Sequence, residues 1–239
     1  MIDDAQVERV LVIAAHPDDV DFGAGGTVAV HTERGVAVTY CIVTDGDAGG
    51  YDRDVPRSAV GPLRRKEQAA AAEQVGVKDL VFLGYPDGRV EVTLELRRDL
   101  SRVIRQVRPQ RVISQSPTRN LDRVGASHPD HLAVGEAALC AVYPDARNPF
   151  AFPELLEEEG LEAWTVLEMW LSSDPGSNHV VDTTEQFERK WHALAEHASQ
   201  LPDPEATRQR IRSWNEEIAQ RFGLGEGRTA EAFRVVATA

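Results

Sequence analysis

The chain has 239 residues, 42% of them hydrophobic and 27% charged, and its formal net charge is −13, which fits one α/β domain with a full core. A chain this acidic lacks the basic surface that binds nucleic acids and anionic membranes. We therefore expect neither as a partner. We expect no leader peptide, because no basic segment or cleavable apolar stretch precedes the first predicted strand, and no apolar run reaches the ~20 residues that cross a bilayer. Cys41 and Cys140 lie in apolar segments, so we expect two buried thiols and a cytoplasmic location.

Strands and helices are predicted to alternate along the first 140 residues. The predicted strands are 9–14, 36–43, 80–83 and 111–113, and the predicted helices are 25–34, 64–75 and 94–107. This alternation is typical of βαβ units and a Rossmann-like, mostly parallel sheet flanked by helices. After residue 143 the pattern loosens, with strands at 166–171 and 180–181 and helices at 185–200 and 204–222. We interpret 1–239 as one domain, in which 143–239 completes a core formed by 1–142.

Three polar side chains follow directly on the first predicted strand: His16, Asp18 and Asp19. Ligands bind open α/β sheets at the carboxyl ends of the strands, so a site is expected at this turn. Two histidines and one carboxylate are a standard ligand set of catalytic zinc, which keeps a fourth position for water. His16 and Asp19 could supply two of these ligands, while Asp18 stays free to accept a proton and pass it to a leaving amine.

A second polar cluster, Ser127 to His131, supplies two more imidazoles far along the chain. A helix that begins near Ser127 would place His128 and His131 on one face, where they could complete the metal site. Ser127 and Asp130 also have the spacing of a capping box. Asp130 is therefore either a helix-start residue without a chemical role or a partner that orients one of the histidines. Together the two clusters predict a zinc-type hydrolase.

Other types of site fit the sequence less well. Segment 23–26 is rich in glycine but lacks the G-x-G-x-x-G order directly after the strand, which argues against a dinucleotide site. The chain has no G-x-S-x-G elbow, which argues against a serine hydrolase. His31 and His192 lie within predicted helices and are expected at the surface or in packing, whereas His179 and His197 remain candidates to reach the site.

The chain resembles the PIG-L or LmbE-like deacetylases, the family of N-acetylglucosaminyl-phosphatidylinositol de-N-acetylase and of the mycothiol and bacillithiol pathway deacetylases. The resemblance covers nearly the whole chain. The matching segments are Ala15 to Asp19, Gly25 to Thr27, Thr44 to Gly46, Arg64 to Glu67, Leu83 to Gly88, His128 to His131 and His197 to Gln200. The family pattern often has Glu after the second aspartate, where this chain has Val20 followed by Asp21. That variant also occurs among thiol-pathway members and leaves the ligand set intact.

The resemblance implies a metal centre and a reaction. Zinc, or another divalent metal such as Fe²⁺, would be held by His16, Asp19 and His131. Asp18 would be the general base. The implied reaction is hydrolysis of an N-acetyl amide, commonly on a glucosamine unit, by zinc-activated water.

The resemblance also implies roles for three residues around that centre. His128 would stabilise the oxyanion, Asp130 would hold a histidine in orientation, and Arg64 would face the substrate. A fourth protein ligand would close the position that water needs, so we expect His128 to stay off the metal. We also expect it to act in its protonated form, which the nearby charge of Asp130 would favour.

The expected substrate is a small molecule that contains an N-acetylated amino sugar. One alternative is an amidase that cleaves a larger thiol or natural-product conjugate with the same centre, and another is a non-catalytic binding protein of the same fold. The loops expected to line the pocket, 45–62, 114–127 and 144–163, follow no recognisable code, so they do not identify the substrate. A homo-oligomer is compatible with the sequence.

Overall fold

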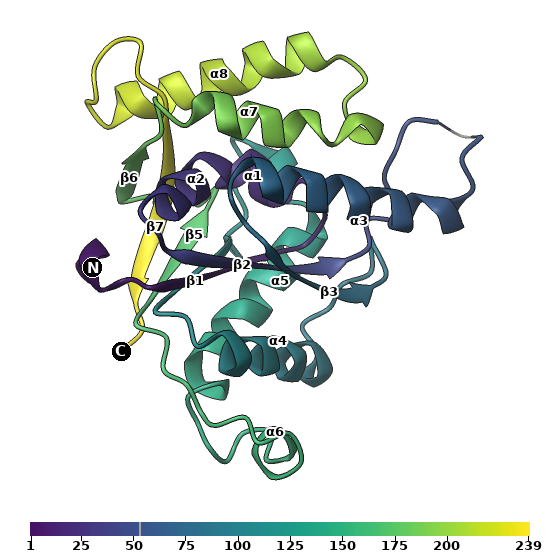
Figure 1. Cartoon of the computed structure of the whole chain (residues 1–239), viewed down its shortest axis with the longest axis vertical. Coiled ribbons are helices and arrows are strands. Elements are labelled where there is room, and N and C mark those ends of the chain that lie inside the picture. The colour runs from purple at the N-terminus through teal and green to yellow at the C-terminus, as the bar shows by residue number, and fades with distance from the viewer. Residues whose placement is uncertain (53) are drawn as a thin grey trace.

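The computed structural model describes residues 1–52 and 54–239, so Arg53 of the predicted loop 45–62 lies outside the described residues. Within these ranges a seven-stranded sheet has helices on both faces (Figure 1). The strands are β1 (Arg9–Ala14), β2 (Ala37–Thr44), β3 (Asp79–Tyr85), β4 (Arg111–Gln115), β5 (Glu168–Ser172), β6 (His179–Asp182) and β7 (Ala230–Ala237). Their order is β3-β2-β1-β4-β5-β7-β6, and only β7 runs antiparallel to its neighbours. The predicted fold class is confirmed.

Both faces of the sheet are buried because side chains alternate along each strand. In β1, Val10 and Val12 point to one hydrophobic cluster, and Leu11 and Ile13 point to the other. The first face is covered by α2 (Gly25–Glu33), α3 (Arg57–Gln74) and α7 (Phe187–Ala195), and the second by α4 (Leu94–Val107) and α5 (Pro129–Cys140). Strands buried on both faces read as the continuous apolar runs seen in the sequence.

An outer helix, α8 (Pro204–Arg221), packs against both α7 and strand β7 (Figure 1). Phe187 and Leu194 of α7 contact Ile211 of α8, and Trp214 extends this cluster. The remaining α-helices, α1 (Asp19–Gly23) and α6 (Glu154–Glu157), are short. No described helix is both long and apolar enough to cross a bilayer.

Several element boundaries differ from the predictions. Helix α3 was predicted over 64–75 but begins at Arg57 and includes Pro62 in its second turn. The predicted helix 185–200 ends at Ala195. Strand β7 was missed because its sequence, Ala230–Ala237, alternates only partly between apolar and polar residues. Cys41 is fully buried as expected, but Cys140 is only half-buried.

The sheet joins the two parts of the chain and determines where the site lies. Strands β5, β6 and β7 from 143–239 pair in the same sheet as β1 to β4. Since β1, β2, β3 and β4 are parallel, the loops after Ala14, Thr44, Tyr85 and Gln115 all start at one edge. Polar residues that are distant in sequence meet at this edge.

Candidate metal centre

The turn after β1 is held in an unusual backbone conformation. Asp18 has φ of 92°, in the left-handed region that non-glycine residues rarely adopt. The backbone amide of Asp18 donates to Gln68 Oε1 at 2.8 Å, and the amide of His16 donates to Asp19 Oδ2 at 2.7 Å. These bonds keep the strained turn in place, as expected where backbone strain serves a site.

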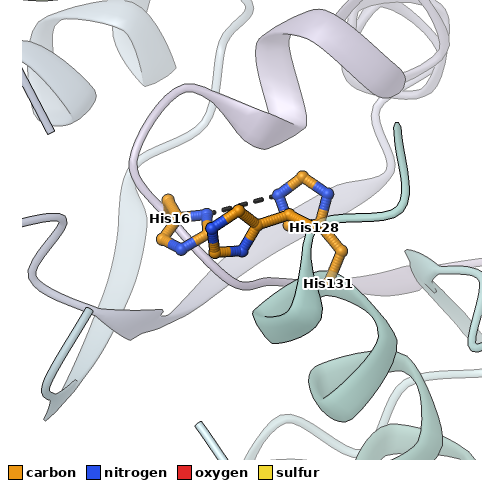
Figure 2. Close-up of side chains that lie close together, drawn as sticks. All are labelled: His16, His128 and His131. Atoms are coloured by element: carbon orange, nitrogen blue, oxygen red, sulfur yellow. Dashed lines mark hydrogen bonds between the residues drawn. The ribbon is translucent and has the colours of Figure 1, made fainter. Parts of the chain in front are cut away.

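Donor atoms of His16, Asp19 and His131 lie close together in a donor triangle, in which Asp19 presents a different carboxylate oxygen to each histidine. Nδ1 of His16 lies 3.1 Å from Asp19 Oδ2, and Nε2 of His131 lies 3.0 Å from Asp19 Oδ1. The two ring nitrogens are 3.3 Å apart, along the dashed line in Figure 2. His131 comes from the first turn of α5, 115 residues after His16, so only the folded chain brings the three groups together.

The triangle has the dimensions of a tetrahedral zinc site. Ligand atoms at about 2.0–2.1 Å from zinc in a tetrahedron lie about 3.3 Å from one another. The two histidine nitrogens lie at this separation, 3.3 Å, and each is 3.0 to 3.1 Å from one oxygen of Asp19, Oδ2 for His16 and Oδ1 for His131. His128 is also near, since its ring nitrogen lies within 4.8 Å of those of His16 and His131. The residues present therefore fit a divalent metal.

The second nitrogen of His16 faces two buried carboxylates. Nε2 lies 3.0 Å from Asp87 Oδ1 and 3.2 Å from Asp130 Oδ2. Asp130 is itself fixed, because the backbone amides of Gly88 and Val90 donate to its two oxygens. Such a contact places the proton of His16 on Nε2 and leaves Nδ1 free to bind a metal. Asp87 was not singled out from the sequence, although it lies in the turn that carries the family resemblance.

The charges around the site favour a cation at the triangle. Burial alone would lower the pKa of His16, but Asp19, Asp130 and Asp87 outweigh it and raise this pKa to about 12. The pKa of His131 is also raised against burial, by Asp19. The pKa of Asp19 is well below its usual range because these two histidines outweigh its burial. A site that stabilises protonated imidazoles so strongly also stabilises a bound metal ion.

Asp18 has the properties of a proton acceptor that titrates near neutral pH. Burial and the adjacent charge of Asp19 raise its pKa to about 6, although Arg64 opposes this shift. Arg64 Nη2 donates to Asp18 Oδ2 at 3.0 Å. A base with a pKa near the working pH is well suited to general acid–base catalysis.

Arg64 is a buried support of the turn. It is 4% exposed and donates to the carbonyl oxygens of Gly46 and Pro17 as well as to Asp18. These contacts explain how Arg64 positions Asp18. A direct contact between Arg64 and a substrate stays a prediction.

His128 differs from its expected state. It is the N-cap of α5 instead of a residue on its face, and its Nδ1 accepts the backbone amide of Asp130 at 3.2 Å. Burial and the charges of His16 and His131 lower its pKa, and Asp130 does not outweigh them. The expectation of a protonated His128 is therefore wrong in this structure. The neutral ring carries its proton on Nε2 and can still donate from there.

A second layer of buried polar groups supports the turn from below. Asp21 Oδ2 accepts from Gln68 Nε2 and contacts His197 Nε2, each at 2.9 Å. Asp21 and His197 are both fully buried, so His197 reaches the site only through Asp21 and Gln68. His179 instead packs against Trp170.

The other two histidines behave as packing and surface residues. His31 is buried, with Nε2 3.1 Å from Arg111 Nη1. His192 is exposed on α7. Both positions agree with the sequence-based expectation.

A cavity of about 630 Å³ opens at the metal centre and is lined there by Asp18, Asp19 and His131. Its other walls come from the loop 120–126, the segment 172–177 and α8. A smaller cavity of about 330 Å³ also begins at Asp18 and passes Tyr51. Loops 45–62 and 114–127 thus contribute as predicted, but the prediction for 144–163 is wrong, since neither cavity is lined by it.

The chain is an α/β protein with a Rossmann-like sheet and a histidine–aspartate centre at the carboxyl ends of the parallel strands. More specifically, the chain belongs to the PIG-L family, described as GlcNAc-PI de-N-acetylase, whose model matches residues 11–142. The match contains both histidine clusters.

Several similar proteins are named as deacetylases of amino sugars. Diacetylchitobiose deacetylase of Thermococcus kodakarensis is 32% identical over 197 residues, covering 82% of this chain and 72% of that protein. A probable N-acetyl-alpha-D-glucosaminyl L-malate deacetylase 2 of Bacillus anthracis is 32% identical over 201 residues, covering 81% of each chain. The solved N,N'-diacetylchitobiose deacetylase of Pyrococcus horikoshii superposes with a TM-score of 0.89 at 30% identity, covering 98% of this chain and 85% of that one.

Proposed function

We propose that the protein is a metal-dependent N-deacetylase that releases acetate from a small molecule containing an N-acetylated amino sugar. The observation that carries the proposal is the triangle of donor atoms from His16, Asp19 and His131, with Asp18 beside it. The names of the relatives support the amide bond and the sugar.

Zinc is the metal that we assign to this centre, and Fe²⁺ would suit the same three donors. A divalent ion at this position would lower the pKa of a water molecule toward ~7 and polarise the amide carbonyl. Asp130 and Asp87 would hold His16 with Nδ1 toward the ion. His128 stays off the ion in this proposal, which keeps one position for water.

Asp18 would take the proton of the attacking water and return it to the leaving nitrogen. Its pKa of about 6 keeps it mostly deprotonated at neutral pH yet able to carry a proton briefly. Arg64 and Gln68 hold the carboxylate and backbone of Asp18 in place. Nε2 of the neutral His128 would donate a hydrogen bond to the carbonyl oxygen as this oxygen becomes negative.

Two alternatives use the same residues. The volume of the main cavity, about 630 Å³, is within the usual range for small-molecule sites. The first alternative is an amidase whose substrate is a larger conjugate, and a cavity of this volume is compatible with it. A binding protein without catalysis would have no need of Asp18 as a spare base beside the metal. A cytoplasmic location is part of the proposal and fits the two free thiols.

The proposal is tested with purified, zinc-loaded protein and a panel of N-acetylated amino sugars and their conjugates. We expect acetate and free amine in equal amounts from at least one member, with Asp18→Asn as the inactive control. If the metal-loaded protein releases acetate from no member of the panel, the proposed deacetylase activity is contradicted. Tight binding of a panel member without turnover would identify a binding protein.

A further inference from the structure

One segment that carries the family resemblance, His197 to Gln200, takes no part in the proposed chemistry. It connects α7 to α8 and contains a short 3-10 turn, Ala198–Gln200. The side chain of His197 is fully buried and lines neither of the two cavities. A residue placed in this way can affect a reaction only through the groups that it contacts.

Helix α3 holds the peptide group between Pro17 and Asp18 from both sides. Arg64 Nη2 donates to the carbonyl oxygen of Pro17. Gln68 Oε1 accepts the backbone amide of Asp18 at 2.8 Å. This peptide group leads into Asp18, whose φ of 92° is costly for a residue with a side chain. The direction in which the Asp18 carboxylate leaves the turn therefore depends on Arg64 and Gln68.

The side-chain amide of Gln68 can make its contact in only one orientation. The backbone N–H of Asp18 can only donate, so it must meet the oxygen of the Gln68 amide. The nitrogen of this amide then points the other way and donates to Asp21 Oδ2 at 2.9 Å. Asp21 is fully buried, and its Oδ1 has no hydrogen-bond partner among the described residues. The contacts of this carboxylate are therefore concentrated on Oδ2.

His197 donates to the same oxygen of Asp21, with its Nε2 at 2.9 Å. The segment that carries His197 is fixed on α3, because the backbone amide and the hydroxyl of Ser199 donate to the Glu67 carboxylate at 2.8 and 2.7 Å. With two donors on one buried oxygen, the Asp21 carboxylate cannot rotate without breaking both hydrogen bonds, which is costly away from water. His197 thus fixes the acceptor that orients Gln68.

We propose that His197 is a positioning residue for the general base, Asp18. Through Asp21 it fixes the amide of Gln68, and this amide holds the peptide group that precedes the base. The inference rests on the proposed function, because it assigns the base to Asp18. Since His197 contacts neither the cavities nor the donor triangle, its loss should lower kcat and leave KM and zinc content as in the parent.

The first measurement does not require turnover. Hydrogen exchange of the Asp18 backbone amide, followed by NMR on zinc-loaded protein, reports on its bond to Gln68. His197→Leu removes a donor to Asp21 and should speed this exchange by about tenfold, the effect of one hydrogen bond. His197→Gln can place an amide nitrogen near the position of Nε2 and should restore most of the protection. The amide of Val12, inside β1, should exchange as in the parent, which shows that the sheet stays closed.

The second measurement separates the rate of acetate release into kcat and KM. The probe is N-acetylglucosamine, or the member of the amino-sugar panel that the parent hydrolyses fastest. His197→Leu should lower kcat by about tenfold and Gln68→Met by about 10–100-fold, the usual cost of losing a group that orients a ligand or base. If His197 acts through Gln68, the double variant should be no slower than Gln68→Met alone. Losses that multiply in the double variant would overturn the inference.

The matched control is Ile211→Ala, which removes buried contacts between α8 and α7 but changes none of the residues that link His197 to Asp18. It should lower the melting temperature and keep the parental kcat. An equal loss of kcat in this control would mean that His197 acts only through packing. If His197→Leu does not fold, His197→Asn replaces it, because its shorter amide ends near the position of Nδ1 and does not reach Asp21.

The two measurements separate this inference from the proposed function. If the parent releases acetate and a folded His197 variant keeps the parental kcat, the positioning role is overturned and the deacetylase stands. If the parent releases no acetate but the His197 variant speeds exchange at Asp18, the link from His197 to Asp18 stands and the deacetylase is contradicted. Unchanged exchange at Asp18 would overturn the link in either case.

Discussion

The backbone amide of Asp130 lies 3.2 Å from Nδ1 of His128 and can only donate, so this ring nitrogen carries no proton. The pKa of His128 is also lowered by burial and by the charges of His16 and His131. Both observations make His128 neutral at pH 7, with its one proton on Nε2. A neutral imidazole can stabilise an oxyanion without changing charge at alkaline pH.

His128→Gln should therefore keep its metal and lose about 10²–10³ in kcat, the usual cost of one oxyanion donor. Because His128 is neutral at neutral and higher pH, the alkaline limb of the rate profile should stay where it is in the parent. Metal analysis and initial rates across pH check both points. Lost metal would make His128 a ligand, and a displaced alkaline limb would contradict the neutral ring.

His131→Ala should fold but hold much less zinc than the parent. Its Nε2 is one corner of the donor triangle, whereas its removal leaves the sheet and the buried helix face intact. Zinc is measured by elemental analysis, and folding by circular dichroism. His192→Ala, which changes an exposed histidine on α7, is the control. Equal zinc in the His131 and His192 variants would reject the ligand assignment.

Asp18→Asn should keep zinc while turnover falls by about 10²–10⁴, because the amide preserves shape but cannot accept a proton. The contact with Arg64 Nη2 can be kept by the amide oxygen. Asp79→Asn removes an exposed carboxylate at the start of β3, away from the site, and should be fully active. Near-parental turnover of the Asp18 variant would mean that another group is the base.

His31 makes stability depend on pH, independently of the metal. Burial, and next Arg111, lower the pKa of His31 to about 4, below the ordinary histidine value of 6.5. Between these values the unfolded chain binds a proton that the folded chain does not, so stability falls as pH falls from 6.5 toward 4 and is unaffected above. From pH 7 to 5 the loss due to His31 is about 2 kcal/mol.

Urea unfolding of the parent and of His31→Gln at pH 7 and pH 5 checks this prediction. Glutamine keeps an acceptor for Arg111 but does not titrate, so its loss of stability on acidification should be smaller by about 2 kcal/mol. Equal losses in the two proteins would show that His31 does not carry the effect.

Local patterns were enough to predict much of the fold and the centre. The strand 9–14 and the helix 94–107 match the structure because their apolar residues, turns and caps are contiguous. The donors at His16, Asp19 and His131 could be proposed because each lies beside an element boundary in a dense polar cluster. The pairing partners of β7 could not be predicted from the sequence, because a strand is defined by its neighbours elsewhere in the chain.

The sequence by itself therefore determined which side chains could carry the chemistry, because motif and element are local properties. Only the tertiary structure decided that Asp130 turns to His16 rather than to its neighbour His131, that Asp87 joins it, and that α8 walls the cavity. These relationships join residues dozens to more than a hundred positions apart, and the parallel order β3-β2-β1-β4 brings them to one edge. Long-range proximity is a consequence of packing the whole sheet, which no short segment encodes.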